Sequence, residues 1–150
     1  MSKLGIGVVG VGEMGKRHAE NLRRLVPQAN LIAVADADAA RAKQVAADLE
    51  IEHSYSSLDA MLERKDIRCI VIATPDKFHA DAVRAAAAAG KDILCEKPLA
   101  LNSEDAYSAM NAAEKAGVRL QVGFMRRYDP AYAAAKKRIE AGEIGEPVIF

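Results

Sequence analysis

The segment Leu4-Gly-Ile-Gly-Val-Val-Gly-Val-Gly-Glu-Met-Gly15 decides the fold of this chain. Its apolar start, residues 4–9, predicts a buried strand, and the sequence then turns through Gly10-x-Gly12-x-x-Gly15 into helical spacing. A strand, a GxGxxG turn and a helix in this order are typical of a dinucleotide-binding βαβ unit. In such a unit Gly10 permits the tight turn, Gly12 lets the backbone approach a pyrophosphate, and Gly15 lets the helix pack against the strand.

The start of this helix and the end of the second expected strand supply further contacts. Backbone amides at Glu13 and Met14 open the helix, where unpaired N–H groups meet phosphate. The second strand ends at Asp36, about twenty residues after the glycines, where a carboxylate accepts hydrogen bonds from the adenosine ribose hydroxyls. Alternatively, Asp36 caps the next helix, a role for which Asp38 competes. A carboxylate here repels a 2′-phosphate and favours NAD over NADP, although Arg41 offers that phosphate a partner.

Apolar, β-branched runs alternate with alanine-rich stretches along the chain, which predicts βα units around a parallel sheet. We expect strands at 4–9, 31–35, 51–55, 68–73, 92–95 and 120–124, with the weakest pattern at 51–55. Apolar positions three and four apart predict helices at 13–26, 38–49, 58–64, 78–89, 104–116 and 131–141. Six strands in this alternation suit an α/β fold of the Rossmann type, with a doubly wound parallel sheet.

Length, charge and cysteine content narrow the function classes. The 150 residues are 51% hydrophobic, enough for one independent core. The 21 basic and 21 acidic residues cancel, so we expect neither a nucleic acid partner nor an anionic membrane. Cys69 and Cys95 lie in apolar runs and are expected to be buried thiols. The sequence shows no secretory leader pattern or membrane-spanning run, and we expect a cytoplasmic protein.

Two further segments are expected at the carboxyl edge of the sheet. The fourth strand runs into Ala73-Thr74-Pro75-Asp-Lys-Phe-His79, and the fifth runs into Cys-Glu96-Lys97-Pro. Ligands of doubly wound folds bind beyond the carboxyl ends of the strands, so these side chains are expected around one crevice. From the residues alone, Lys97 could equally be a solvated lysine in a loop, and His79 a cap or packing residue.

At this point the sequence is similar to a known family. The blocks GVVGVGEMGKRHAENL, AVADAD, ATPDKFHADAVRAAAAAGKDILCEKPLA and GFMRRYDP occur in the order found in Gfo/Idh/MocA oxidoreductases and span essentially the whole chain. The last block resembles that of inositol 2-dehydrogenases in particular. The resemblance implies the NAD-binding domain of an oxidoreductase that transfers hydride between NAD and a secondary alcohol of a polyol or sugar, such as myo-inositol.

The resemblance also implies roles for the segments at the carboxyl edge. It makes Lys97, beside the cofactor, the catalytic residue for proton transfer at the substrate hydroxyl. It implies that Glu96 helps to hold the nicotinamide ribose. It places the segment from Ala73 through Thr74 and Pro75 to His79 along the cofactor. A lysine near cationic NAD⁺ in a closed crevice is suited to proton transfer, since that surrounding favours its neutral form.

Other patterns carry weaker signals. Tyr132-x-x-x-Lys136 fits the YxxxK of short-chain dehydrogenases, but the phosphate loop and the position after the sixth strand argue against that group. Residues 126–128 either face a polyol or form a solvated basic turn. His18 and His53 are taken as structural or surface residues, and no metal site is predicted because no ligand spacing surrounds them.

The sequence also predicts a domain boundary. Residues 1–142 form the expected cofactor-binding domain, and 143–150 look like a turn and the start of a strand that opens a second, substrate-binding α/β domain. The chain is then expected to bind cofactor but to be nearly inactive alone, because hydride transfer needs the substrate held against the nicotinamide. A stand-alone NAD(H)-binding module and a short dehydrogenase completed by homo-oligomerisation are the alternatives.

Overall fold

The computed structural model describes residues 2–148, which form six strands, six α-helices and two short 3₁₀ helices. The strands are β1 (Leu4–Val9), β2 (Ala29–Ala35), β3 (His53–Tyr55), β4 (Cys69–Ile72), β5 (Asp92–Cys95) and β6 (Leu120–Val122). The α-helices are α1 (Glu13–Arg24), α2 (Ala39–Asp48), α3 (Leu58–Leu62), α4 (His79–Ala88), α5 (Ser103–Ala116) and α6 (Pro130–Glu140). The 3₁₀ helices are η1 (Asp76–Phe78) and η2 (Met125–Tyr128).

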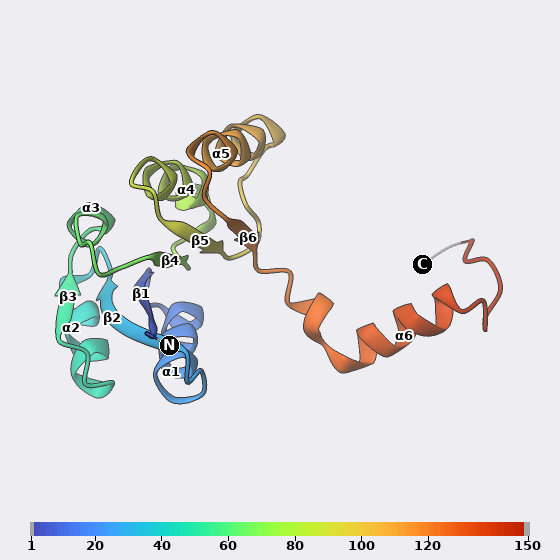
Figure 1. Cartoon of the computed structure of the whole chain (residues 1–150), viewed down its shortest axis with the longest axis horizontal. Coiled ribbons are helices and arrows are strands. Elements are labelled where there is room, and N and C mark those ends of the chain that lie inside the picture. The colour runs from blue at the N-terminus through green and yellow to red at the C-terminus, as the bar shows by residue number, and fades with distance from the viewer. Residues whose placement is uncertain (1, 149–150) are drawn as a thin grey trace.

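The six strands form one parallel sheet in the order β3-β2-β1-β4-β5-β6. Helices α1 and α2 cover one face, and α3, α4 and α5 cover the other (Figure 1). The strand order reverses direction between β1 and β4, which is the point where doubly wound sheets bind ligands. The expected α/β fold of the Rossmann type is confirmed.

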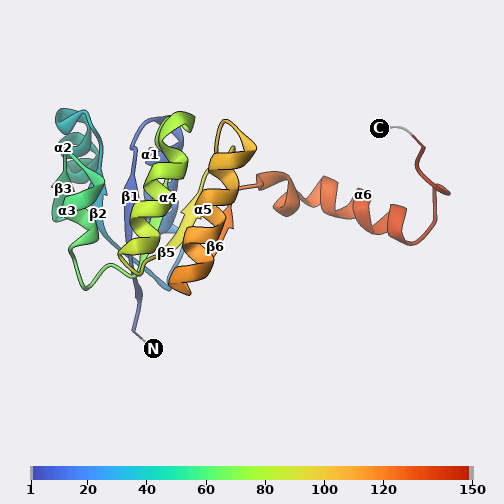
Figure 2. The same ribbon diagram turned by 90° about the horizontal axis from the view of Figure 1, so that it is seen from above.

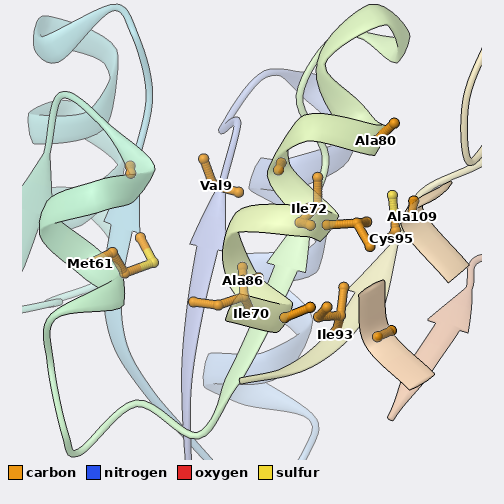
Figure 3. Close-up of a cluster of buried hydrophobic side chains, with 14 of the residues drawn as sticks. Val9, Met61, Ile70, Ile72, Ala80, Ala86, Ile93, Cys95 and Ala109 are labelled. Atoms are coloured by element: carbon orange, nitrogen blue, oxygen red, sulfur yellow. The ribbon is translucent and has the colours of Figure 1, made fainter. Parts of the chain in front are cut away.

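The core consists of two hydrophobic layers, one on each face of the sheet. Side chains alternate along a strand, so Ile70 and Ile72 of β4 pack beneath α4 while Val71 packs on the opposite face. Figure 3 shows the layer under α4, where Ile70 and Ile72 lie among alanines of the helices. These small residues let α4 lie close to the sheet and α5 lie close to α4, as the alanine-rich sequence suggests.

Several element boundaries differ from the sequence prediction for local reasons. Helix α1 ends at Arg24 rather than 26, because Pro27 restricts the residue before it to extended backbone. Strand β2 begins at Ala29, two residues early, and bulges by one residue opposite β1. Strand β6 stops at Val122, and the expected continuation gives way to η2. The weak third strand shrinks to three residues.

The C-terminal part of the chain extends away from the sheet. Helix α6 projects away from the sheet, as both views show (Figures 1 and 2), and none of its residues is buried. After Gly142 the chain makes turns, and Val148 is 90% exposed outside any strand. Ile149 and Phe150, where the strand was expected to continue, lie outside the described residues. Between residues 2 and 148, no helix has the length and apolar character to cross a membrane.

Candidate functional site

The carboxyl ends of the parallel strands bring the expected site segments to one edge of the sheet. Backbone hydrogen bonds fix this register from strand to strand: the amide of Gly10 donates to Ala35 O at 2.8 Å, and that of Ala73 donates to Val9 O at 2.9 Å. The amide of Glu96 continues the ladder by donating to Ile72 O at 2.9 Å. Four expected parts of the site therefore start from adjacent strands: the GxGxxG turn, Asp36, and the segments after β4 and β5.

The turn after β1 requires two of its glycines. Gly10 has a φ of +80°, and a Cβ there would lie 2.5 Å from the Thr74 amide nitrogen. Gly15 lies in the first turn of α1, and its Cβ would lie 1.7 Å from the carbonyl oxygen of Gly10. Helix α1 therefore rests directly on the turn, in agreement with the roles expected for these two glycines.

Gly12 differs from the other two because a Cβ there would meet no atom within 4 Å. It is the N-cap of α1, and no side chain caps this helix start. The first amides of a helix have no intrahelical acceptor, so those around Glu13 and Met14 are available to a ligand. The open space at Gly12 and the uncapped helix start together form a cradle suited to an anionic group.

Asp36 lies at the end of β2 with its carboxylate against the phosphate loop. It is 8% exposed, and its Oδ2 accepts a hydrogen bond from the Val11 amide at 2.8 Å. Its Oδ1 accepts from the Asp38 amide at 2.9 Å, and the Arg41 guanidinium lies 3.4 Å away. Capping of α2 is left to Asp38, which accepts from the amides of Ala40 and Arg41. The alternative that Asp36 caps this helix is therefore excluded.

Two adjoining cavities lie between these elements. The larger, about 610 Å³, runs from the phosphate loop and the start of α1 to Asp36 and the segment after β4. The smaller, about 340 Å³, continues past Thr74 and Phe78 toward α3 and has a mostly apolar wall. The larger cavity is lined by eight of the expected site residues: Gly10, Gly12, Glu13, Met14, Asp36, Ala73, Thr74 and Pro75.

Thr74 supports the presence of a polar ligand at this place. It lines both cavities, and its Oγ1 is buried without a hydrogen-bond partner in the described structure. Buried polar atoms are normally paired, and an orphan hydroxyl beside a cavity is a natural donor or acceptor for a bound group. The cradle at Gly12, the carboxylate of Asp36 and this hydroxyl fit the phosphates and ribose of a dinucleotide.

Glu96 and Lys97 lie at the same edge but outside the walls of the larger cavity. One carboxylate oxygen of Glu96 lies 2.7 Å from His18 Nε2 of α1, and the other accepts from the Lys97 amide at 3.3 Å. The side chain of Glu96 is only 17% exposed, whereas Lys97 is exposed. Glu96 is thus held in place between α1 and its own loop, while Lys97 is exposed to solvent at this edge.

His79 begins α4 and is 1% exposed. Its two ring nitrogens face the carbonyl oxygens of Thr74 and Pro98, each at 2.7 Å. It is not among the residues that line either cavity. Of the expected site residues, His79 and Gly15 lie behind the cavity wall and support it from within.

Three residues that line the larger cavity are not predicted from the sequence as site residues: Ala37, Asp38 and Arg41, the last of which the sequence suggests only as a partner for a 2′-phosphate. Phe78 also lines this cavity and lies within the segment 73–79 that is expected along the cofactor. The sequence offers a signal for them, since each lies within five residues of Asp36 or Thr74. His18, taken as structural or surface, proves to be the partner of Glu96. No local signal could reveal that pair, because 78 residues separate its members.

The two cysteines and the possible metal ligands of the chain bear on the chemistry of this site as well. Burial raises the pKa of the Cys95 thiol, next to Glu96, to about 12, and that of Cys69 to about 11. Both thiols therefore stay protonated and are poor nucleophiles. Throughout the part of the chain that the structure describes, no group of three or more histidine, cysteine or acidic residues is arranged to hold a metal ion.

Comparison with known proteins agrees with this geometry. The model of the GFO_IDH_MocA family, described as "Oxidoreductase family, NAD-binding Rossmann fold", matches residues 4–124. The chain is 46% identical over 143 residues to scyllo-inositol 2-dehydrogenase (NAD(+)) of Bacillus subtilis, covering 95% of this chain and 42% of that protein. It is 43% identical over 149 residues to an inositol 2-dehydrogenase of Rubrobacter xylanophilus, covering 99% and 43%.

Solved structures give the same result. The scyllo-inositol dehydrogenase of Lactobacillus casei with bound NAD(H) and scyllo-inositol superposes with a TM-score of 0.92 at 32% identity, over 97% of this chain and 43% of that one. The myo-inositol dehydrogenase of the same organism, in complex with NAD(H) and myo-inositol, gives a TM-score of 0.91 at 31% identity, over 97% of this chain and 44% of that one. The chain thus spans less than half the length of these relatives.

The contrast between Gly15 and Gly12 gives a prediction about stability. Gly15→Ala should lower the free energy of unfolding by about 2 kcal/mol or more, because its Cβ collides with the Gly10 carbonyl, although alanine favours helix elsewhere. Gly12→Ala should change it by at most about 1 kcal/mol, because space is free there. Urea unfolding of both variants measures the difference. Equal losses would contradict the close contact of α1 with the turn.

Proposed function

This chain belongs to the Gfo/Idh/MocA oxidoreductase family and is an NAD-binding Rossmann domain, and from that premise we propose that it presents NAD for hydride transfer with a polyol. The observation that carries the proposal is the cavity of about 610 Å³ at the point where the strand order reverses. Its wall combines an uncapped helix start, the carboxylate of Asp36 and an unpaired hydroxyl. These three groups match the parts of a dinucleotide.

In this proposal each part of the cavity wall holds one part of NAD. The amides at Gly12, Glu13 and Met14 bind the pyrophosphate, and Asp36 accepts from the hydroxyls of the adenosine ribose. The smaller, more apolar cavity suits the adenine ring. The segment from Ala73 to Pro75 lies on the way to the nicotinamide end, toward the loop of Glu96 and Lys97.

The reaction requires a proton acceptor beside the substrate. When bound, the nicotinamide accepts hydride from a secondary alcohol, and the hydroxyl proton must leave in the same process. We assign that proton to the amine of Lys97, which is exposed at the carboxyl edge. We assign Glu96, held by His18 and by the Lys97 amide, to the nicotinamide ribose. The family resemblance supports both assignments.

For the whole protein we propose a cytoplasmic, NAD-dependent dehydrogenase acting on an inositol-like polyol. The inositol dehydrogenases that match this chain support that substrate class. We take residues 1–142 as the cofactor-binding domain and 143–150 as the start of the substrate-binding one. On this basis the 150 residues alone bind NAD but turn over polyol very slowly, because substrate must be held within about 3–3.5 Å of its reaction partner.

Cofactor binding is the direct test of this proposal. The folded chain should bind NADH, and fluorescence titration should show at least about tenfold weaker binding for Gly12→Ala, because the new methyl group occupies the free space beside the uncapped helix start. Leu25→Ala, at the other end of α1 and 72% exposed, is the control and should leave the Kd unchanged. A folded chain that failed to bind NADH would overturn the proposal.

The choice of NAD over NADP depends on the charge of Asp36. Asp36→Asn keeps an oxygen for the Val11 amide but removes the charge, so NADH should bind about tenfold more weakly, the difference between a charged and a neutral acceptor. NADPH should lose less or bind more tightly, since repulsion of its 2′-phosphate falls. Asp48→Asn, on the far end of α2, serves as control. Equal losses for both cofactors would show that Asp36 does not read the ribose.

A last prediction concerns Lys97 in the whole protein. Lys97→Ala should lower kcat for inositol oxidation by about a hundredfold or more, the usual contribution of a positioned proton acceptor. Its Kd for NADH should stay within about threefold, because Lys97 lies outside the cavity wall. Lys43→Ala, exposed on α2, controls for loss of a surface charge. Normal turnover at saturating substrate would remove Lys97 from the chemistry.

A further inference from the structure

His79 occupies an unusual position for a buried histidine. Its ring lies between the loop after β4 and the loop after β5, with Nε2 at 2.7 Å from Thr74 O and Nδ1 at 2.7 Å from Pro98 O. Thr74 lines the cofactor cavities, and Pro98 directly follows Lys97. One side chain therefore connects the wall of the cofactor cavity to the loop that carries the proposed proton acceptor.

The two contacts impose a condition on the ring. A carbonyl oxygen can only accept, so both nitrogens satisfy these contacts only if both carry a hydrogen. A neutral imidazole has one N–H and would leave a nitrogen lone pair facing an oxygen at 2.7 Å. A nitrogen that carries a hydrogen therefore donates it to the carbonyl that it faces. Since its side chain is 1% exposed, water cannot replace either bond.

The rest of the sheet edge shows why these bonds matter. The last ladder bond between the two strands runs from the Glu96 amide to Ile72 O at 2.9 Å. Beyond this bond the segments after β4 and β5 leave the sheet, and the His79 ring lies between them. The imidazole comes from the first residue of α4, whose alanines and Val83 are packed against the sheet, so its anchor is rigid.

We propose that His79 is a positioning residue that fixes the Lys97 loop relative to the cofactor cavity, because its ring contacts a carbonyl oxygen of each loop. The proposal deepens the proposed function and rests on it for the role of Lys97. It assigns His79 no contact with cofactor or substrate. Its effect on the reaction passes through the backbone on either side: Thr74 toward the cofactor and Pro98 toward Lys97.

The hydrogen bonding of the ring is the first test. In the chain labelled with ¹⁵N at its three histidines, the ring spectra should show a His79 N–H that is hydrogen-bonded to one of the two loop carbonyls. Assignment uses His79→Gln and, as matched control, His53→Gln, whose ring stacks on Tyr55 far along the sheet. A His79 ring without a hydrogen bond to either carbonyl would overturn the proposal.

Hydrogen exchange tests whether His79 holds the two loops together. In His79→Gln, the amides of Thr74, Glu96 and Lys97 should exchange about tenfold faster or more, as expected for the loss of a buried hydrogen bond. Amides of β1 and α2 should keep their rates, and His53→Gln should change none of these. Faster exchange throughout the domain would indicate a general loss of stability, and unchanged exchange rates in the two loops would show that His79 does not hold them together. Either result would overturn the positioning role.

Kinetics of the whole protein complete the test. His79→Gln should lower kcat for inositol oxidation by about tenfold while its Kd for NADH stays within about threefold, because Lys97 is displaced and the phosphate and adenosine ends are not. His53→Gln should change neither. Loss of NADH affinity with unchanged kcat would overturn the role. The ring spectra and exchange rates are measured without cofactor, so failure of the wild-type chain to bind NADH would contradict the proposed function separately.

Discussion

The contact between Gly15 and the carbonyl of Gly10 is the constraint on which the site depends. The first turn of α1 presses so closely on the turn after β1 that a single methyl group would lie 1.7 Å from that oxygen. Gly10 is confined in turn by the Thr74 amide after β4. The turn is thus held between a helix and the end of a neighbouring strand. This packing places the uncapped start of α1 beside the cavity and keeps it there.

The other parts of the site connect to this contact through the backbone. Asp36 accepts from the Val11 amide within the turn, so the carboxylate that is proposed to bind ribose also secures the phosphate loop. On the other side, His18 of α1 reaches Glu96 after β5. Helix α1 therefore connects the two proposed ends of the cofactor site, from the phosphate loop to the loop of Lys97. A shift of this helix would disturb both ends together.

The sequence predicts those parts of the site that depend on local chemistry. The GxGxxG turn, the acid at the end of β2 and the segment after β4 are short patterns with a direct physical meaning, and the cavity indeed joins Gly12, Asp36 and Thr74. Pairings between distant segments could not be predicted, because neither residue signals its partner. His18 with Glu96 and His79 with Pro98 are such pairs. The bulge in β2 and the short β3 likewise depend on tertiary contacts that override local propensity.

The position of Arg41 bears on the choice between NAD and NADP. An arginine after the ribose acid can in principle hold the 2′-phosphate of NADP. Here its guanidinium already pairs with Asp36 at 3.4 Å and with Asp38 at 3.3 Å. A phosphate would have to draw Arg41 away from both carboxylates and would then lie beside their two negative charges. In the proposed site the ribose hydroxyls of NAD meet no such cost, because they would donate to Asp36 while Arg41 stays in place. The same ion pairs that order the start of α2 therefore favour NAD.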